Sequence, residues 1–107
     1  MKTYFLVFSN PLDGKEDEYN DWYTNVHLKE VVAIEGFKSA QRFVLTKEQQ
    51  NANQPHKYLA IYEIENQDIE GTLQSLQTAS IKMKMEPVID LKNVKISIFQ
   101  SITDIIK

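Results

Sequence analysis

Tyr23 and His27 are the residues of this 107-residue chain whose types and spacing most directly allow chemistry. They stand four positions apart in a helical pattern, which places a phenol and an imidazole one turn apart on the same face. A histidine titrates near neutral pH and can act as a general base, while the phenol can donate to an oxyanion or hold the imidazole in place. The structural alternative is a histidine at the edge of the core, bonded to Glu30 or to a backbone carbonyl.

Three further residues could contact a ligand, namely Trp22, Asn10 and Arg42. Trp22 is amphipathic and could form a wall of an aromatic pocket, although a lone helical tryptophan more commonly belongs to the core. Asn10 ends the first predicted strand, near the mouth of such a pocket, and its alternative role is to form the turn ahead of Pro11. Arg42 could bind an anionic group of a ligand, or pair with Glu63 or with a carboxylate of a second subunit. We favour the pair, because an unpaired charge in a strand is costly.

The elements that must position these residues begin with a strand from Lys2 to Ser9, which is rich in aromatic and branched side chains. Both of its alternating faces are apolar, so both should be buried. An acidic stretch, Glu16 to Glu18, opens the first helix, because negative charge is favourable at a helix N-terminus. This helix carries one apolar stripe, formed by Tyr19, Trp22, Tyr23, Val26 and His27.

Glu30 interrupts the helical pattern. A regular helix would place its charge in the middle of the apolar stripe, at a cost in free energy. Either the helix breaks near Leu28 and a short second turn follows through residues 31–33, or Glu30 has a partner such as His27. We favour the break. Gly36 then ends the helical region, because glycine readily adopts the left-handed conformation that closes a helix.

The second predicted strand runs from Phe37 to Thr46 and alternates regularly, so Phe43 and Arg42 should point to opposite faces. If Phe43 faces the helices, Arg42 faces away from them, toward a second subunit. A polar loop, residues 47–56, leads to a third strand from Lys57 to Ile64.

The remaining elements are a helix, a connector and a strand. The helix begins at Asn66 or Asp68, both suitable N-caps, and carries a narrow apolar seam. Residues 79–91 contain Met83 and Met85, and we interpret them as a packed connector in preference to an adaptable flap. The last strand is predicted from Lys92 to Ile102.

The resulting order is βαββαβ in a single domain of residues 1–107. This order is typical of the ferredoxin-like α+β fold, in which a four-stranded antiparallel sheet carries two helices on one face. The other face of the sheet has no helices to cover it, yet the first strand is apolar on both sides. We therefore expect a homodimer.

The composition of the chain limits which kinds of partner we expect. The net charge is −3 and the lysines are scattered, so no nucleic-acid partner is expected. No stretch approaches the ~20 apolar residues of a spanning helix, and no membrane partner is expected. The absence of cysteine is compatible with a cytoplasmic protein. His27 and His56 lack a ligand-like spacing, and the three glycines are isolated, so neither a metal nor any other cofactor is expected.

Several of these stretches together resemble the dimeric α/β barrel superfamily, and most closely its EthD-like and REDY-like small proteins. The residues that carry the resemblance are Asn10-Pro11, Trp22-Tyr23, His27-Leu28 and Gly36-Phe37. Two positions depart from those families, since Glu35 and Lys29 stand where proline is common. The resemblance implies two sheets packed across a two-fold axis, with a pocket between sheet and helices in each subunit.

Members of this superfamily act as cyclases, isomerases, dehydratases or cofactor-free monooxygenases on aromatic or polyketide-like compounds. Its haem-degrading members use a histidine on the second helix, and residues 68–78 contain none, so haem is not expected. The resemblance thus implies a small enzyme of secondary metabolism that uses His27 and Tyr23 on a hydrophobic metabolite. The alternative is a non-catalytic ligand-binding or stress-associated barrel protein.

Overall fold

A computed structural model describes residues 1–65, 67–83 and 87–107 of the chain. Its centre is one antiparallel sheet with the strand order β2-β3-β1-β4. The strands are β1 (Thr3–Ser9), β2 (Phe37–Val44), β3 (Tyr58–Ile64) and β4 (Lys95–Gln100). The two central strands, β1 and β3, are also the most apolar, as expected for strands that are covered on both edges.

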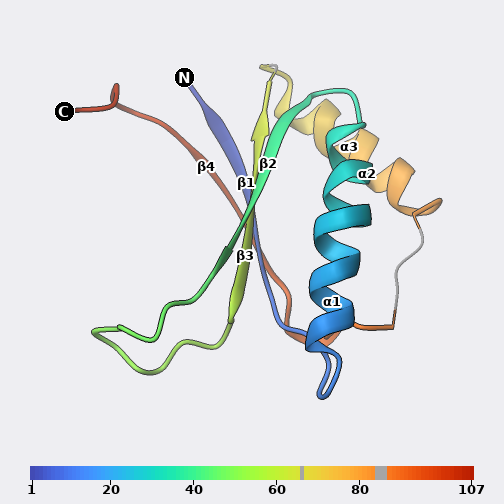
Figure 1. Cartoon of the computed structure of the whole chain (residues 1–107). Coiled ribbons are helices and arrows are strands. Elements are labelled where there is room, and N and C mark those ends of the chain that lie inside the picture. Colours follow the sequence, from blue (N-terminus) through green and yellow to red (C-terminus); the bar gives the residue numbers. More distant parts are fainter. Residues whose placement is uncertain (66, 84–86) are drawn as a thin grey trace.

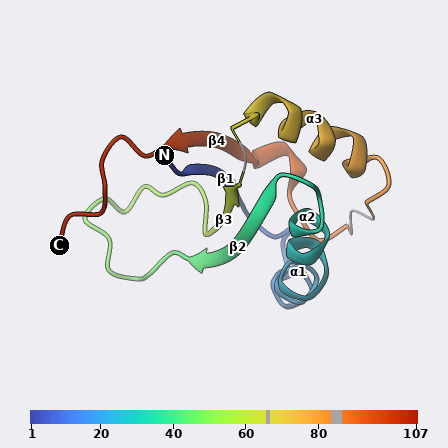
Figure 2. The same ribbon diagram turned by 90° about the horizontal axis from the view of Figure 1, so that it is seen from above.

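The helices all lie on one face of this sheet (Figure 1). They are α1 (Glu16–Trp22), the π-helical turn η1 (Tyr23–His27), α2 (Leu28–Val32) and α3 (Ile69–Ser80), with a 3₁₀ turn η2 (Leu91–Asn93) before β4. Seen from above, α1 and α2 lie toward β2 and α3 lies toward β4 (Figure 2). The ferredoxin-like βαββαβ fold predicted from the sequence is confirmed.

Element boundaries differ from the expected ones by a few residues. Asp68 is the N-cap of α3, since its carboxylate accepts a hydrogen bond from the Gly71 backbone N–H at 2.9 Å; the other candidate cap, Asn66, lies outside the described residues. The last strand, predicted from Lys92, starts at Lys95, because the 3₁₀ turn η2 occupies Leu91–Asn93. Met83 packs against the core, whereas Met85 is outside the described part of the chain.

The first helix continues through the predicted break. Residues 23–27 form a widened π turn, in which the Leu28 backbone N–H bonds to the Tyr23 carbonyl, and α2 follows without interruption. The favoured break at Leu28 is therefore wrong, and the alternative, Glu30 next to His27, is observed, with Glu30 Oε1 3.6 Å from His27 Nδ1. The extra residue in the turn also rotates Val26 out of the apolar stripe, where it is 44% exposed.

A β-bulge near the start of β2 breaks the expected alternation. Phe37 is opposite Ile64 and Ser39 is opposite Glu63, so Lys38 is one residue too many for its partner strand. Beyond the bulge the inward positions are Ala40 and Arg42, which pair with the buried Tyr62 and Ala60. Phe43 consequently faces away from the helices and is 41% exposed. Phe43 and Arg42 thus point to opposite faces as predicted, but the condition that would turn Arg42 toward a second subunit, Phe43 facing the helices, is not met.

The core lies between the sheet and the helices and is dominated by aromatic rings. Phe5, Phe37 and Tyr62 form a triangle with centroid separations of 6.0–6.1 Å. Tyr19, Trp22 and Tyr23 extend this cluster along α1 and η1, and all are at most 5% exposed. The aromatic side chains of the first strand and the first helix therefore form one continuous core.

The opposite face of the sheet is apolar and carries no helix. The strand pairing places Tyr4, Leu6, Phe8, Phe43, Leu59, Ile61 and Phe99 on it. Phe43 and Phe99 are 41% and 58% exposed, and a hollow of about 380 Å³ lies beside Phe8 and His56. None of the helices in the described ranges is long and apolar enough to span a bilayer.

Candidate functional site

A cavity of about 400 Å³ lies between the sheet and the helices that cover one of its faces. Its wall is mainly aliphatic and aromatic, with contributions from β1, β3, β4, α2 and α3. The polar groups on this wall belong to Tyr23, His27, Tyr62, Gln77 and Ser80. An apolar cavity of this size with a few polar groups is typical of a small-molecule site.

The π turn brings the two principal candidates together at this cavity. The rings of Tyr23 and His27 meet edge to face, with centroids 5.2 Å apart and planes at 83°. The indole of Trp22 stacks on the imidazole, with centroids 4.7 Å apart and planes at 20°. The imidazole is therefore fixed in orientation by two aromatic neighbours. π turns of this kind occur frequently at functional sites.

His27 is largely buried, with 14% of its side chain exposed, and it lines the cavity. Its Nδ1 lies 3.6 Å from Glu30 Oε1, and neither atom has a hydrogen-bond partner among the described residues. Burial lowers the pKa of His27 below its usual value, and the Glu30 carboxylate opposes this shift only in part. The imidazole is consequently neutral at neutral pH, the form in which it can accept a proton.

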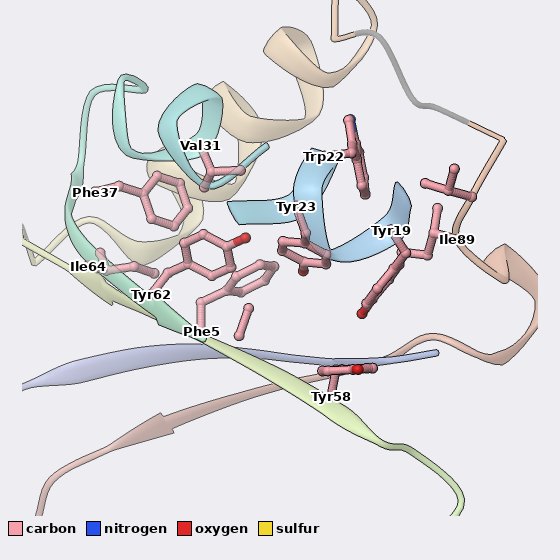
Figure 3. Close-up of a cluster of buried hydrophobic side chains, with 12 residues drawn as sticks. Phe5, Tyr19, Trp22, Tyr23, Val31, Phe37, Tyr58, Tyr62, Ile64 and Ile89 are labelled. Carbon is pink, nitrogen blue, oxygen red and sulfur yellow. The ribbon is translucent and has the colours of Figure 1, made fainter. Parts of the chain in front are cut away.

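Tyr62 is a third chemically competent residue at the cavity, and no sequence pattern singled it out. Its hydroxyl points toward the ring of Tyr23 in Figure 3, and both residues are at most 2% exposed. Burial raises the pKa of Tyr23 to about 12, partly offset by a hydrogen bond with Tyr62, and it raises the pKa of Tyr62 as well. Both phenols are therefore protonated near neutral pH and can act as hydrogen-bond donors.

Arg42 lies behind the site, against the faces of three tyrosines. Its guanidinium carbon is 4.6 Å from the ring centroid of Tyr23 and 5.3 and 5.2 Å from those of Tyr19 and Tyr58. It also donates to Asn20 Oδ1 and Thr24 Oγ1, each at 2.9 Å. Of the two favoured ion pairs of Arg42, the one with Glu63 is wrong, because Glu63 lies on the other face and meets Lys38 at 3.7 Å. The pair with a carboxylate of a second subunit stays a prediction.

Trp22 and Asn10 differ in their relation to the cavity. Trp22 backs the imidazole of His27 from outside the cavity wall, and its indole N–H has no partner within the described residues. Asn10 is remote, since its amide donates to the Pro55 carbonyl at 2.8 Å and accepts from the Lys57 N–H at 2.7 Å. The structure thus brings Tyr23, His27 and Trp22 together. Arg42 contacts the ring of Tyr23 from outside the cavity. Asn10 lies away from the cavity and links its own loop to Pro55 and Lys57.

The described residues contain no cluster of three or more His, Asp or Glu side chains that could hold a metal ion. The chemical groups at the site are one imidazole, two phenols and a carboxylate, beside an apolar cavity. Such a set can bind an aromatic or aliphatic ring system, exchange a proton with it and hydrogen-bond a carbonyl oxygen.

Comparison with known proteins places the chain in a family context. A family model described as a domain of unknown function (DUF4286) matches residues 3–102. No curated protein matches the sequence. Solved structures, in contrast, match over nearly the whole chain.

Three of these structures illustrate the similarity. An ethyl tert-butyl ether D (EthD) family protein from Bacillus halodurans has a TM-score of 0.66 at 8% identity, over 95% of this chain and 100% of its own. A mutant of MhuD with two manganese protoporphyrin IX molecules bound per active site has a TM-score of 0.69 at 14% identity, over 98% and 99%. A dimeric ferredoxin-like protein of unknown function from Thermobifida fusca has a TM-score of 0.58 at 14% identity, over 92% and 90%.

The structural neighbours are therefore EthD-family and dimeric ferredoxin-like α+β proteins, as the sequence resemblance implied. At identities of 8–14% the likeness concerns the fold.

Proposed function

The chain belongs to the family of the domain of unknown function DUF4286, and from that premise we propose that it binds a hydrophobic, aromatic or polyketide-type metabolite in its cavity. We further propose that His27 acts there as the base of a cofactor-free cyclisation, isomerisation or dehydration. The observation that carries this proposal is the position of a neutral imidazole on the wall of a 400 Å³ apolar cavity.

In this mechanism His27 removes a proton from a carbon next to a carbonyl group of the ligand. The proton moves to the imidazole, and the electron pair moves to the carbonyl oxygen as an enolate. Tyr23 or Tyr62 hydrogen-bonds that oxygen, because both phenols keep their protons near neutral pH. Return of the proton to another position of the ligand completes an isomerisation. In a cyclisation the enolate carbon bonds to the carbon of a second carbonyl, whose oxygen becomes an alkoxide and takes the proton back from the His27 imidazolium.

The second candidate is a barrel protein that binds such a compound without transforming it. The mainly apolar wall favours this function, since it offers burial to a ring system but few groups that can react. Arg42 supports either candidate from outside the cavity, by holding the ring of Tyr23.

We also propose that the working form is a homodimer. The support is the apolar, helix-free face of the sheet, together with the dimeric state named for the Thermobifida fusca protein of the same fold. Joining two such faces would bury ~2,000 Å² or more in total, as in other obligate dimers.

The experiment uses a panel of planar aromatic ketones and polyketide-like lactones, with binding measured by calorimetry and turnover by mass spectrometry. Leu76→Trp fills the cavity from α3 and should abolish binding while the protein stays folded. His27→Gln should keep binding and lower turnover by ~10²-fold or more. His56→Gln, which removes a histidine outside the cavity, is the matched control.

Binding without turnover in the wild type, unchanged in His27→Gln, would support the binding protein over the enzyme. Binding that survives Leu76→Trp would contradict the cavity as the ligand site altogether.

A further inference from the structure

Glu30 presents a buried oxygen to a buried nitrogen of His27. Both Glu30 Oε1 and His27 Nδ1 are shielded from solvent, and neither has a hydrogen-bond partner among the described residues. The two atoms are 3.6 Å apart, a few tenths of an ångström beyond a hydrogen bond. A buried acceptor and a buried potential donor that face each other are each costly when unpaired, so a small rotation of the Glu30 side chain that joins them is favourable.

Two aromatic neighbours hold the plane and the position of the imidazole ring. Trp22 covers one ring face at a centroid distance of 4.7 Å, and Tyr23 meets the ring edge to face at 5.2 Å. Since Nδ1 is sealed and the ring nonetheless lines the cavity, Nε2 is the nitrogen that a ligand can reach. Glu30 lies three residues after His27, across the junction of η1 and α2, so the helix backbone fixes the facing pair.

We propose that Glu30 is a positioning residue that accepts a hydrogen bond from Nδ1–H of His27 and so leaves Nε2 unprotonated toward the cavity. An imidazole whose one nitrogen donates to a carboxylate has its tautomer and its orientation set by that bond. An imidazole free in water favours the opposite form, with the proton on Nε2. Without Glu30, the nitrogen that faces the ligand would therefore carry a proton and could not act as a base.

The catalytic consequence rests on the proposed function, but the tautomer itself does not. Glu30 also opposes the effect of burial on the pKa of His27, which keeps the imidazole basic enough to accept a proton. The same carboxylate therefore sets both which nitrogen is free and how readily it takes a proton.

Long-range ¹H–¹⁵N correlation spectra of the ligand-free, ¹⁵N-labelled full chain test the proposal at a pH above neutrality. The His27 signals are assigned by their loss in His27→Gln. The wild type should show mainly the Nδ1–H form, and Glu30→Ala should return His27 to the Nε2–H form. Glu30→Gln keeps an acceptor but no charge, so it should retain Nδ1–H while the pKa of His27 falls below its wild-type value.

The matched control is Glu18→Gln, which removes the charge from an exposed ion pair with Lys15 (3.3 Å) that has the same three-residue spacing as His27 and Glu30. It should leave the His27 spectrum unchanged. An Nε2–H form in the wild type, or an unchanged tautomer in Glu30→Ala, overturns the proposal. The wild-type spectrum shows the tautomer of His27 directly, so it tests the proposal even if Glu30→Ala does not fold. It also needs no ligand. Failure of the proposed function would appear separately in the binding assay, as ligand binding that is the same in Leu76→Trp as in the wild type.

Discussion

Trp22 and His27 stack with their ring planes inclined by 20°, although they stand five positions apart along the helix. In a regular α-helix, residues five apart point about 140° away from each other, because each turn takes 3.6 residues. The π turn of residues 23–27 removes this angle and lets one face carry Trp22, Tyr23 and His27 together. The site therefore depends on a backbone irregularity as much as on its side chains.

The stability of the protein should fall as the pH drops below about 6.5, the usual pKa of a histidine. The folded protein holds His27 neutral because burial lowers its pKa, whereas the unfolded chain binds a proton. The unfolded state therefore gains protons first, and the free energy of unfolding decreases until the lowered pKa is passed. Denaturant titrations at a series of pH values should show this slope in the wild type and in His56→Gln, and a flatter profile in His27→Gln.

Gly36→Ala should destabilise the protein by about 3 kcal/mol or more. Gly36 has a φ of +104°, and an added Cβ would lie 2.3 Å from Thr72 Oγ1. Gly14→Ala is the matched control, because its φ is also positive, +75°, but nothing lies within 4 Å of the added atom. It should cost only the backbone term of about 1–2 kcal/mol. Equal losses in thermal or chemical unfolding would contradict the clash with Thr72.

Light scattering after size exclusion should give twice the 12.5 kDa mass of one chain. Leu6→Asp places a charge at the centre of the helix-free sheet face and should yield monomers. Val26→Asp makes the same kind of change on the outer helical surface, where Val26 is 44% exposed, and should remain dimeric. A wild-type monomer with native circular dichroism would remove the dimer from consideration.

Arg42→Met should destabilise the fold by about 1–3 kcal/mol. The variant loses the contacts with three tyrosine rings and the hydrogen bonds to Asn20 and Thr24. Arg42→Lys keeps the charge but lacks the planar fork, so its loss should be intermediate. Urea unfolding of the wild type, Arg42→Lys and Arg42→Met measures whether stability falls in that order. A Met variant as stable as the wild type would mean that the stacked guanidinium contributes nothing net.

Phe5→Ala should cost about 3–5 kcal/mol, as is usual for a buried aromatic residue. Phe5 is 6% exposed and packs against both Phe37 and Tyr62. Ile81→Ala truncates a side chain that is 83% exposed and should change the free energy of unfolding by less than about 0.5 kcal/mol. A loss below about 1 kcal/mol for Phe5→Ala would contradict its place in the core.

The sequence patterns predicted the fold because the apolar periods of most elements are regular. Strand β1 shows period-two burial of Thr3, Phe5 and Ser9, and β3 shows the same for Tyr58, Ala60, Tyr62 and Ile64. Those periods, with the order of the elements, suffice for a ferredoxin-like sheet. The pairing of Tyr23 with His27 was also predictable, because four-residue spacing brings two side chains together in an α turn and in this wider one alike.

The structure departs from the predicted pattern at the π turn and at the β-bulge. At each place the backbone holds one residue more than a regular helix or strand would. Neither the π turn at residues 23–27 nor the bulge at Lys38 has a marker such as proline or glycine within it. Each is maintained by long-range packing, which a local pattern does not encode. Tyr62 was missed for a related reason, since its place opposite Phe5 is a matter of strand register. The alternation of β3 did, however, put it on the buried face.

The surplus residue at Lys38 sets how the chain can change length during evolution. If one residue between Phe37 and Arg42 were deleted, the strand would become regular and both side chains would still face the helices, because an even number of steps would separate them. If two were deleted and the bulge were lost, or one were inserted and only the present bulge were kept, Arg42 would be carried to the helix-free face, away from Tyr23. Relatives of this chain that lose one residue here can therefore lose the bulge with it and still keep the arginine beside Tyr23.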